Sequence, residues 1–289
     1  MPFRDVIGHR RLVGLLARSV CRELLPPSLI FAGPAGVGKR LAALATAQAL
    51  NCTARFPKNS EPNTDIECDA CGMCTVCARI ARGVHPDVLI VEPGDSGSIK
   101  IEQVRDIVDR AAYRPFEGRR RAVIIGAADA LVPAAQQALL KTLEEPPPSS
   151  VFMLITARPD MLLPTVRSRC PRLQFRPLGQ HDIAAAMVAR GHSESEARAV
   201  AATADGSLAR ALDTSAGDLA EARDVELLST RADVRALANP DVQPALERLT
   251  KAYDGERGMR AFTAVDRALL ALDRNAGVKI VADWLVLQL

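Results

Sequence analysis

One short segment constrains the fold of this chain more than any other. Residues 33–40 read Gly-Pro-Ala-Gly-Val-Gly-Lys-Arg, and they lie between an apolar run at 29–32 and an alanine-rich helical pattern at 41–50. A strand, a glycine-rich turn and a helix in this order are typical of a phosphate-binding loop, in which backbone N–H groups and a lysine hold phosphate oxygens. The residues predicted to form this loop are Gly33, Gly36, Gly38 and Lys39.

The same segment lacks the group that positions the metal of a bound nucleotide. The loop pattern requires a serine or threonine after the lysine as a Mg²⁺ ligand, and this chain has Arg40 there. A second metal-binding group should be an acid at the end of a buried strand, which the β-branched run 121–125 predicts. That run is followed by Gly126 and Ala127, and the first acid is Asp129. We therefore expect a P-loop fold that does not hydrolyse ATP, while weak nucleotide binding stays open.

Composition excludes several functional classes. The chain has 289 residues, enough for two or three domains, and only 3% of them are aromatic, so base-stacking surfaces are not expected. A net charge of +3 is too small to predict nucleic-acid binding by a basic surface alone. The run Arg119–Arg121 is interpreted as a solvated turn before a strand, with a subunit contact as the alternative. No apolar run approaches the length of a membrane span and the amino terminus lacks a signal-peptide pattern, so we expect a cytoplasmic protein that contacts no membrane.

A cluster of cysteines predicts a structural zinc site. Cytoplasmic cysteines favour metal binding over disulfides, and five of the seven in this chain are Cys52, Cys68, Cys71, Cys74 and Cys77. Overlapping C-x-x-C steps between residues 71 and 77 allow several thiolates to reach one tetrahedral ion. We predict one Zn²⁺ held by Cys52, Cys71, Cys74 and Cys77.

Other residues compete for this site or stand apart from it. Cys68 competes with Cys52 for the fourth position, but four evenly spaced ligands would crowd one short segment, so we prefer Cys52 at the end of the loop helix. His85 offers another substitute, which we interpret as a loop histidine. Cys21 and Cys170 stand alone in the sequence and are predicted to be packed thiols.

Strand and helix patterns alternate through the first part of the chain. Buried strands are predicted at 88–91, 121–125 and 151–156, with helices at 101–108 and 134–143. This alternation predicts a parallel sheet with helices on both faces, in an α/β domain over residues 1–177 with a cysteine-rich insertion at about 52–77.

The rest of the chain shows helical patterns only. Segments 182–189 and 193–204 predict two short helices, and the second opens with a Ser-x-x-Glu capping box. We expect a small helical domain at 178–216 and an all-α packing or assembly domain at 217–289.

Two longer motifs carry a family resemblance. Residues 139–147 read Leu-Leu-Lys-Thr-Leu-Glu-Glu-Pro-Pro, and residues 168–170 read Ser-Arg-Cys. Together with Asn51-Cys52, the cysteine run and a His-Pro-Asp triplet at 85–87, they resemble the bacterial DNA polymerase III clamp-loader family of AAA+ proteins, over residues 1 to about 212. The resemblance implies an AAA+ domain, a zinc module in its insertion, a helical lid at 178–216 and a collar at 217–289.

The resemblance also distinguishes between subunit types. Gamma/tau subunits of this family are motors that hydrolyse ATP, and a delta-prime subunit is a stationary member of the ring. The motors have a loop hydroxyl, an Asp-Glu pair after the third strand and an arginine after Gly-Ser-Leu. This chain has Arg40, Gly126-Ala127 and Ala209 there. The resemblance therefore implies the delta-prime type. The alternatives are a gamma/tau-type motor with a degenerate site and a free-standing zinc and nucleotide-binding module.

The same resemblance implies a functional arginine and a set of partners. Arg169 is expected at the sheet edge far from the P-loop, as an arginine finger that acts in trans on a neighbouring ATPase subunit. Lys141, Glu144 and Glu145 are interpreted as residues that end a helix. The implied partners are gamma/tau and delta subunits in a hetero-pentameric ring, with the sliding clamp and primed DNA reached through the complex.

Overall fold

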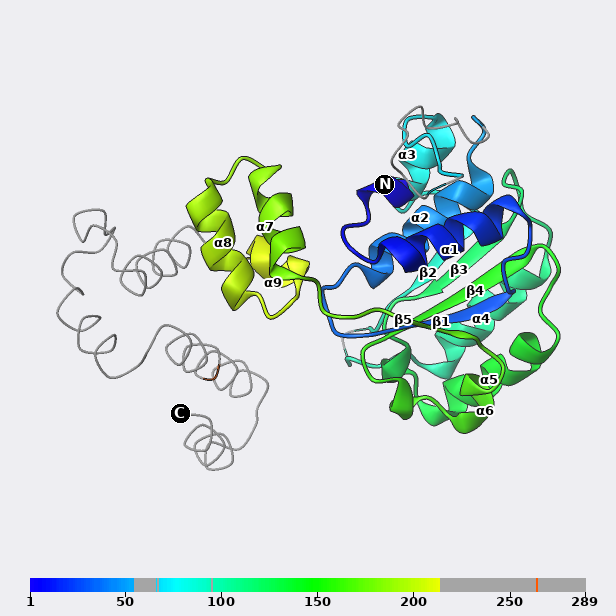
Figure 1. The fold of residues 1–289 in the computed structure, drawn as a ribbon. Coiled ribbons are helices and arrows are strands. Elements are labelled where there is room, and N and C mark those ends of the chain that lie inside the picture. Colours follow the sequence, from blue (N-terminus) through cyan, green and yellow to red (C-terminus); the bar gives the residue numbers. More distant parts are fainter. Residues whose placement is uncertain (55–65, 67, 95, 214–263, 265–289) are drawn as a thin grey trace, which may run out of the picture. The chain divides into compact units, whose positions relative to one another are not determined.

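The structure, a computed structural model, describes residues 1–54, 66, 68–94, 96–213 and 264. The chain divides into two compact units, Met1–Pro177 and Leu178–Leu289 (Figure 1). The predicted collar at 217–289 lies, apart from Ala264, outside the described residues.

A five-stranded parallel sheet forms the centre of the first unit. Its strands are β1 (Ser28–Ala32), β2 (Val88–Val91), β3 (Arg121–Ile125), β4 (Ser150–Thr156) and β5 (Arg172–Gln174). Their order across the sheet is β2-β3-β4-β1-β5, so the strand that leads into the phosphate-loop segment lies next to the edge strand β5. The strands predicted at 88–91 and 121–125 are confirmed with the same bounds.

Helices cover both faces of this sheet, as predicted (Figure 1). The helices of the unit are α1 (Arg10–Cys21), α2 (Lys39–Asn51), α3 (Thr75–Ala81), α4 (Ile101–Ala112), α5 (Pro133–Glu144) and α6 (Pro164–Arg167). Helices α1 and α2 share a core with Leu29 and Phe31 of β1, whereas α4 and α5 share the opposite core with Ile30 and Ala32. Alternate residues of one strand thus enter two cores, which explains why the predicted strands are apolar throughout.

The ends of helices α5 and α2 fix the positions of the Glu-Glu-Pro-Pro motif and of the first cysteine of the cluster. Helix α5 begins with Pro133 at its first turn and ends at Glu144, just before three consecutive prolines that cannot continue it. Helix α2 ends at Asn51, so Cys52 directly follows it. The described residues of the unit also form three short 3₁₀ turns, at Phe3–Asp5, Ala128–Ala130 and Pro159–Met161.

The second unit is helical where it is described. It contains α7 (Gln180–Val188), α8 (Glu194–Thr203) and α9 (Leu208–Asp213). The predicted capping box of α8 is confirmed, because the Ser193 hydroxyl accepts a hydrogen bond from the Glu196 amide and the Glu196 carboxylate accepts one from the Ser193 amide. Within the described residues of both units, every helix is too short or too polar to span a membrane.

Candidate functional site

The glycine-rich segment folds as the turn between β1 and α2. Gly33 directly follows β1, and a Cβ at this position would overlap the Phe175 carbonyl oxygen and lie 2.9 Å from the Phe175 Cβ. Gly38 precedes α2 with a φ of 98°, a left-handed conformation that glycine adopts without strain. The predicted succession of strand, turn and helix is therefore present.

The lysine of this turn is directed at the turn itself. The Lys39 side chain is buried, and its ammonium group donates hydrogen bonds to the carbonyl oxygens of Gly33 and Pro34. Burial lowers the pKa of Lys39, while the Asp129 carboxylate acts in the opposite direction. The charge that holds phosphate in an active P-loop is here satisfied by backbone oxygens of the same segment.

Arg40, at the position of the metal-ligating hydroxyl, forms an ion pair with Glu92. Glu92 follows β2, and the parallel register of β2 with β3 brings it beside Gly126. A Cβ at Gly126 would lie 3.1 Å from the Glu92 Cγ, so the missing side chain at this position leaves room for the glutamate. A carboxylate does reach this strand end, but it comes from the neighbouring strand and faces a guanidinium group instead of a metal.

Asp129, the first acid after β3, is also engaged by side chains of the chain itself. Its carboxylate accepts hydrogen bonds from the Thr156 hydroxyl at 3.0 Å and from the Arg158 Nε at 3.2 Å. Both partners come from the end of β4 or the residues after it. Asp129 therefore stays tied to the neighbouring strand end.

The four cysteines predicted as metal ligands lie together. The Sγ atoms of Cys52, Cys71, Cys74 and Cys77 all lie within 4.8 Å of one another, and those of Cys71 and Cys77 are 4.0 Å apart. Thiolates bound at about 2.3 Å to a tetrahedral Zn²⁺ are about 3.8 Å apart, so a small contraction closes this set around one ion. The cluster can hold a metal ion, and four sulfur donors are a set that zinc prefers.

Local hydrogen bonds arrange the sulfur atoms. The amides of Cys71, Cys74 and Cys77 donate to the sulfurs of Cys52, Cys71 and Cys74, over 3.4, 3.3 and 3.4 Å. Cys74 is also the N-cap of α3, where the helix dipole favours negative charge. Burial on its own would raise the pKa of Cys74, but hydrogen bonds from Cys77 and Thr53 lower this pKa to about 6. Burial raises the pKa of Cys77.

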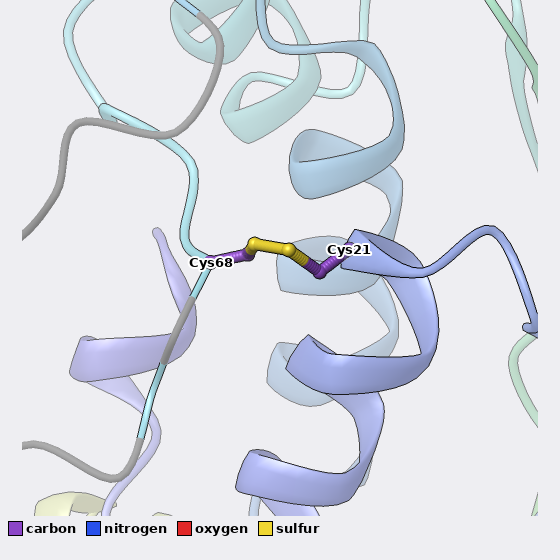
Figure 2. Close-up of a disulfide and its surroundings, with 2 residues drawn as sticks. All are labelled: Cys21 and Cys68. Carbon is purple, nitrogen blue, oxygen red and sulfur yellow. A yellow bond between two sulfur atoms is a disulfide. The ribbon is translucent and has the colours of Figure 1, made fainter.

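Cys68 forms a disulfide with Cys21 (Figure 2). It corrects the prediction that Cys21 is a lone packed thiol and, for these two residues, the expectation of metal binding over disulfides. The two Cα atoms are 5.7 Å apart, and Cys21 is the last residue of α1. The bond ties α1 to the segment just before the cysteine cluster and removes Cys68 as a competitor for the fourth position. Cys170 is a buried free thiol, as predicted.

A buried ion pair lies near the amino ends of β2 and β3, and sequence reasoning missed it. The Asp87 carboxylate accepts hydrogen bonds from the amides of residues 116–118 and from the Arg121 guanidinium at 2.9 Å. Burial alone would raise the pKa of Asp87, but these donors hold it at about 2. Arg121 is therefore not part of a solvated turn. His85 lies outside the cysteine cluster and accepts a hydrogen bond from the Asp87 amide, as a loop histidine.

Arg169 lies between α6 and β5, with its backbone fixed to β1. The Ser28 hydroxyl donates to the Arg169 carbonyl oxygen at 3.2 Å, at the amino end of β1. The prediction that Arg169 lies at the sheet edge far from the phosphate-loop segment is wrong. The edge strand β5, which Arg169 precedes, is the direct neighbour of β1, the strand that leads into that segment. The separation from the phosphate-loop segment runs along β1, roughly 13 Å for its five residues.

The Arg169 side chain is one-third exposed and has partners within its own chain. Its guanidinium forms an ion pair with Glu144 and donates to the Thr165 carbonyl oxygen at 2.7 Å. The two motifs that carry the family resemblance thus meet at this ion pair. At the amino end of β1, Arg169 is too far from the phosphate-loop turn of its own chain to contact it.

Comparisons with known proteins identify relatives among the subunits of DNA polymerase III. A family model described as "DNA polymerase III, delta subunit" matches residues 8–179. DNA polymerase III subunit tau of Salmonella typhimurium is 31% identical over 272 residues, which cover 92% of this chain and 40% of tau. DNA polymerase III subunit delta' of Pseudomonas aeruginosa is 39% identical over 139 residues, 48% of this chain and 39% of the relative. The chain spans about two fifths of the length of these curated relatives.

A solved structure of Thermotoga maritima RuvB shows the same fold. It is 16% identical, covers 98% of this chain and 88% of its own, and has a TM-score of 0.50. The similarity is one of architecture alone, an AAA+-like parallel five-stranded sheet between two layers of helices.

Proposed function

Because the chain belongs to the DNA polymerase III delta subunit family, we propose that it is a stationary, delta-prime-type subunit of a replicative clamp loader. It assembles with gamma/tau and delta subunits in a hetero-pentameric ring in the cytoplasm, as a component of a DNA polymerase III holoenzyme. The ring loads the sliding clamp onto primed DNA. Within it, this chain does not hydrolyse ATP.

One observation carries the proposal of a non-hydrolysing subunit. The cations of the phosphate-loop segment have partners in their own chain, Lys39 on two carbonyl oxygens and Arg40 on Glu92. A hydrolysing site needs a hydroxyl and an acid on Mg²⁺, and a lysine free to meet the phosphates. Nucleotide binding would have to displace both sets of contacts, so we expect ATP to bind weakly or not at all.

Arg169 is the residue that we assign to the neighbouring subunit. An arginine offered in trans stabilises charge that develops on the transferred phosphoryl group. The rigid backbone at Ser28 and the partly exposed guanidinium of Arg169 support this role. Because Arg169 is separated from the phosphate-loop segment of its own chain by the length of β1, we expect it to act on another chain's nucleotide.

The cysteine cluster is assigned a structural zinc ion. Zinc would hold α3 and the segment after α2 together, which gives the insertion a fixed shape at one end of the AAA+ domain. Cys52, Cys71, Cys74 and Cys77 would be its ligands.

A gamma/tau-type motor with a degenerate site is the second candidate. The similarity to tau over 92% of this chain favours it, because that similarity is longer than the one to delta'. ATP hydrolysis by the isolated chain separates the two candidates, since a motor retains turnover and a stationary subunit has none.

The test is co-expression with a gamma/tau and a delta subunit of the same source, followed by purification and ATPase assays. We expect one complex containing all three proteins, with DNA-stimulated hydrolysis that the isolated chain lacks. Steady hydrolysis by the pure chain, at a rate that Lys39→Ala abolishes, would contradict the stationary role. Failure to form any complex would contradict membership of the ring.

A further inference from the structure

Glu144 holds a position that a lone glutamate would not favour. It is the last residue of α5, where unpaired carbonyl groups give the helix end a partial negative charge. A carboxylate at this end is repelled unless a cation lies beside it, and here that cation is Arg169. The ion pair therefore satisfies both the helix end and the arginine.

The contacts of Arg169 divide into a rigid set and a weak set. The backbone is fixed by the Ser28 hydroxyl on its carbonyl oxygen and by its own amide, which donates to Val166 at 3.2 Å. The side chain donates to the Thr165 carbonyl oxygen at 2.7 Å and forms the ion pair with Glu144, in which 33% of the Arg169 side chain and 47% of the Glu144 side chain are accessible. Solvent-exposed ion pairs of this kind contribute little free energy, so a stronger anion can displace the carboxylate.

We infer that Glu144 is a positioning residue that retains the Arg169 guanidinium on its own subunit until a neighbour's nucleotide phosphate displaces it. This inference rests on the proposed function, because it needs Arg169 to act in trans. The carboxylate and the phosphate compete for one guanidinium, and a ligand that must displace a competitor binds less tightly by the free energy of the lost contact. The ion pair thus weakens ATP binding at the neighbouring site. It does not alter the state in which Arg169 already contacts the neighbour's phosphate, because the pair is broken there.

The adjacent Glu145 provides a matched control. Glu145 is the C-cap residue of α5 and is exposed, and the ion pair to Arg169 comes from Glu144. Glu144→Gln and Glu145→Gln remove the same charge, one residue apart, from the same helix end. Both should leave the urea midpoint of unfolding nearly unchanged, because an exposed charge and a partly exposed ion pair each contribute little to the free energy of unfolding.

The first readout uses the isolated full chain and does not depend on the ring. An arginine-specific dicarbonyl reagent is reacted with each variant, and modification of Arg169 is followed by peptide mass spectrometry. We expect Arg169 to react faster in Glu144→Gln than in wild type, by up to about five-fold, the range of an exposed ion pair. Glu145→Gln should react like wild type. Equal rates in all three proteins would overturn the inference.

The second readout uses the assembled complex. The Arg169-dependent part of the ATPase rate is obtained by subtracting the rate of the Arg169→Ala complex. We expect Glu144→Gln to lower the KM for ATP of this part by up to about five-fold with kcat unchanged, and to have no effect when Arg169→Ala is also present. A fall in kcat, or a change shared with Glu145→Gln, would contradict the inference.

The two proposals fail in different ways. An inert Arg169→Ala in a complete ring contradicts the proposed finger itself, and with it the role of Glu144. A damaging Arg169→Ala together with a silent Glu144→Gln contradicts only the role of Glu144.

Discussion

The two ends of the parallel sheet differ in what their charged groups do. At the carboxyl end, where P-loop proteins hold nucleotide, Lys39 contacts its own turn, Arg40 faces Glu92 and Asp129 faces Arg158. At the amino end lie the cysteine cluster, the buried pair of Asp87 with Arg121, and Arg169. Ligands of open α/β sheets bind at the carboxyl ends of strands, so this chain keeps the architecture of a nucleotide site at one end, while the groups to which we assign a function lie at the other end.

If the proposed function is right, the difference shows how a fold can keep its backbone shape after its nucleotide site has lost the groups that hydrolyse ATP. The turn at Gly33 still joins β1 to α2, and Phe175 packs directly against it. The missing metal ligands are replaced by pairs that neutralise one another inside the chain. In the proposed function, the remaining role depends on Arg169 and on the cysteine cluster at the amino end.

Loss of the proposed zinc ion should have the largest effect, at the amino end of the sheet. Cys71→Ser is expected to reduce zinc from about one per chain to none and to unfold the region around the cluster, since structural zinc contributes about 10 kcal/mol or more to small modules. Metal analysis and thermal unfolding of the purified chain measure both effects. The midpoint of unfolding should fall by many degrees.

The disulfide supplies the control for this prediction. Cys68→Ser leaves the four ligands untouched, so zinc should be retained although the bond to Cys21 is lost. Zinc that is kept in Cys52→Ser and lost in Cys68→Ser would show that the wrong cysteine has been assigned as the fourth ligand.

Asp87→Asn should have the next largest effect, also at the amino end. It leaves the buried Arg121 guanidinium without its counter-charge, which costs about 3–5 kcal/mol in the free energy of unfolding. Asp109→Asn, an exposed acid on α4, should change it by less than about 0.5 kcal/mol. Urea unfolding at pH 7 measures both, and equal values for the two variants would contradict a structural role of the pair.

The pH dependence of this pair has a definite sign. The folded-state pKa of Asp87 is about 2, below the unfolded value of 3.8, so its stabilisation is present above about pH 4 and is lost as the pH falls toward 2. The full difference corresponds to about 2.5 kcal/mol. The difference in unfolding free energy between wild type and Asp87→Asn should therefore narrow as the pH falls from about 4 to about 2.

Gly33→Ala should have a moderate effect at the carboxyl end. A methyl group there overlaps the Phe175 carbonyl oxygen, and overpacking of this kind costs about 1–3 kcal/mol. Gly94→Ala is the matched control, because a Cβ at Gly94 meets no atom within 4 Å. An unchanged unfolding free energy in Gly33→Ala would mean that the turn is not held against Phe175.

Much of the fold could be predicted from local sequence, because strands buried on both faces are apolar throughout and helices are periodic. The strand at 121–125 and the capping box at Ser193 are examples. The pairing of distant groups could not be predicted this way. Glu92 and Glu144 are acids at the ends of elements, and only the sheet register and the packing of α5 reveal that they face Arg40 and Arg169.

The cysteines also show that local sequence patterns predict near neighbours but not contacts between distant residues. C-x-x-C spacing shows which thiols share a short segment, so the grouping of Cys71, Cys74 and Cys77 could be predicted from the sequence. The bond between Cys21 and Cys68 spans 47 residues and depends on where α1 ends, which spacing does not encode. The strand β5, with only three residues, was too short to give a pattern.

Arg40→Thr should have the smallest effect on activity. It restores the hydroxyl that ligates Mg²⁺, but Gly126 and Ala127 still lack carboxylates and Lys39 still contacts its own turn. We expect no ATP hydrolysis by the isolated variant. Measurable turnover would show that the carboxyl end of the sheet retains a working site, and the contrast between the two ends would no longer hold.

The central claim is most directly tested by the ATPase rate of a complete ring that contains Arg169→Ala. An arginine supplied in trans contributes about 10³ to 10⁵ in rate at the site that it serves, and only one of several sites depends on this chain. We predict normal assembly and a partial loss of DNA-stimulated ATPase and clamp loading, with Arg169→Lys nearly as impaired because lysine lacks the planar fork. Arg167→Ala, two residues away and paired with Asp160, should behave like wild type. Full activity of the Arg169→Ala ring would contradict the account.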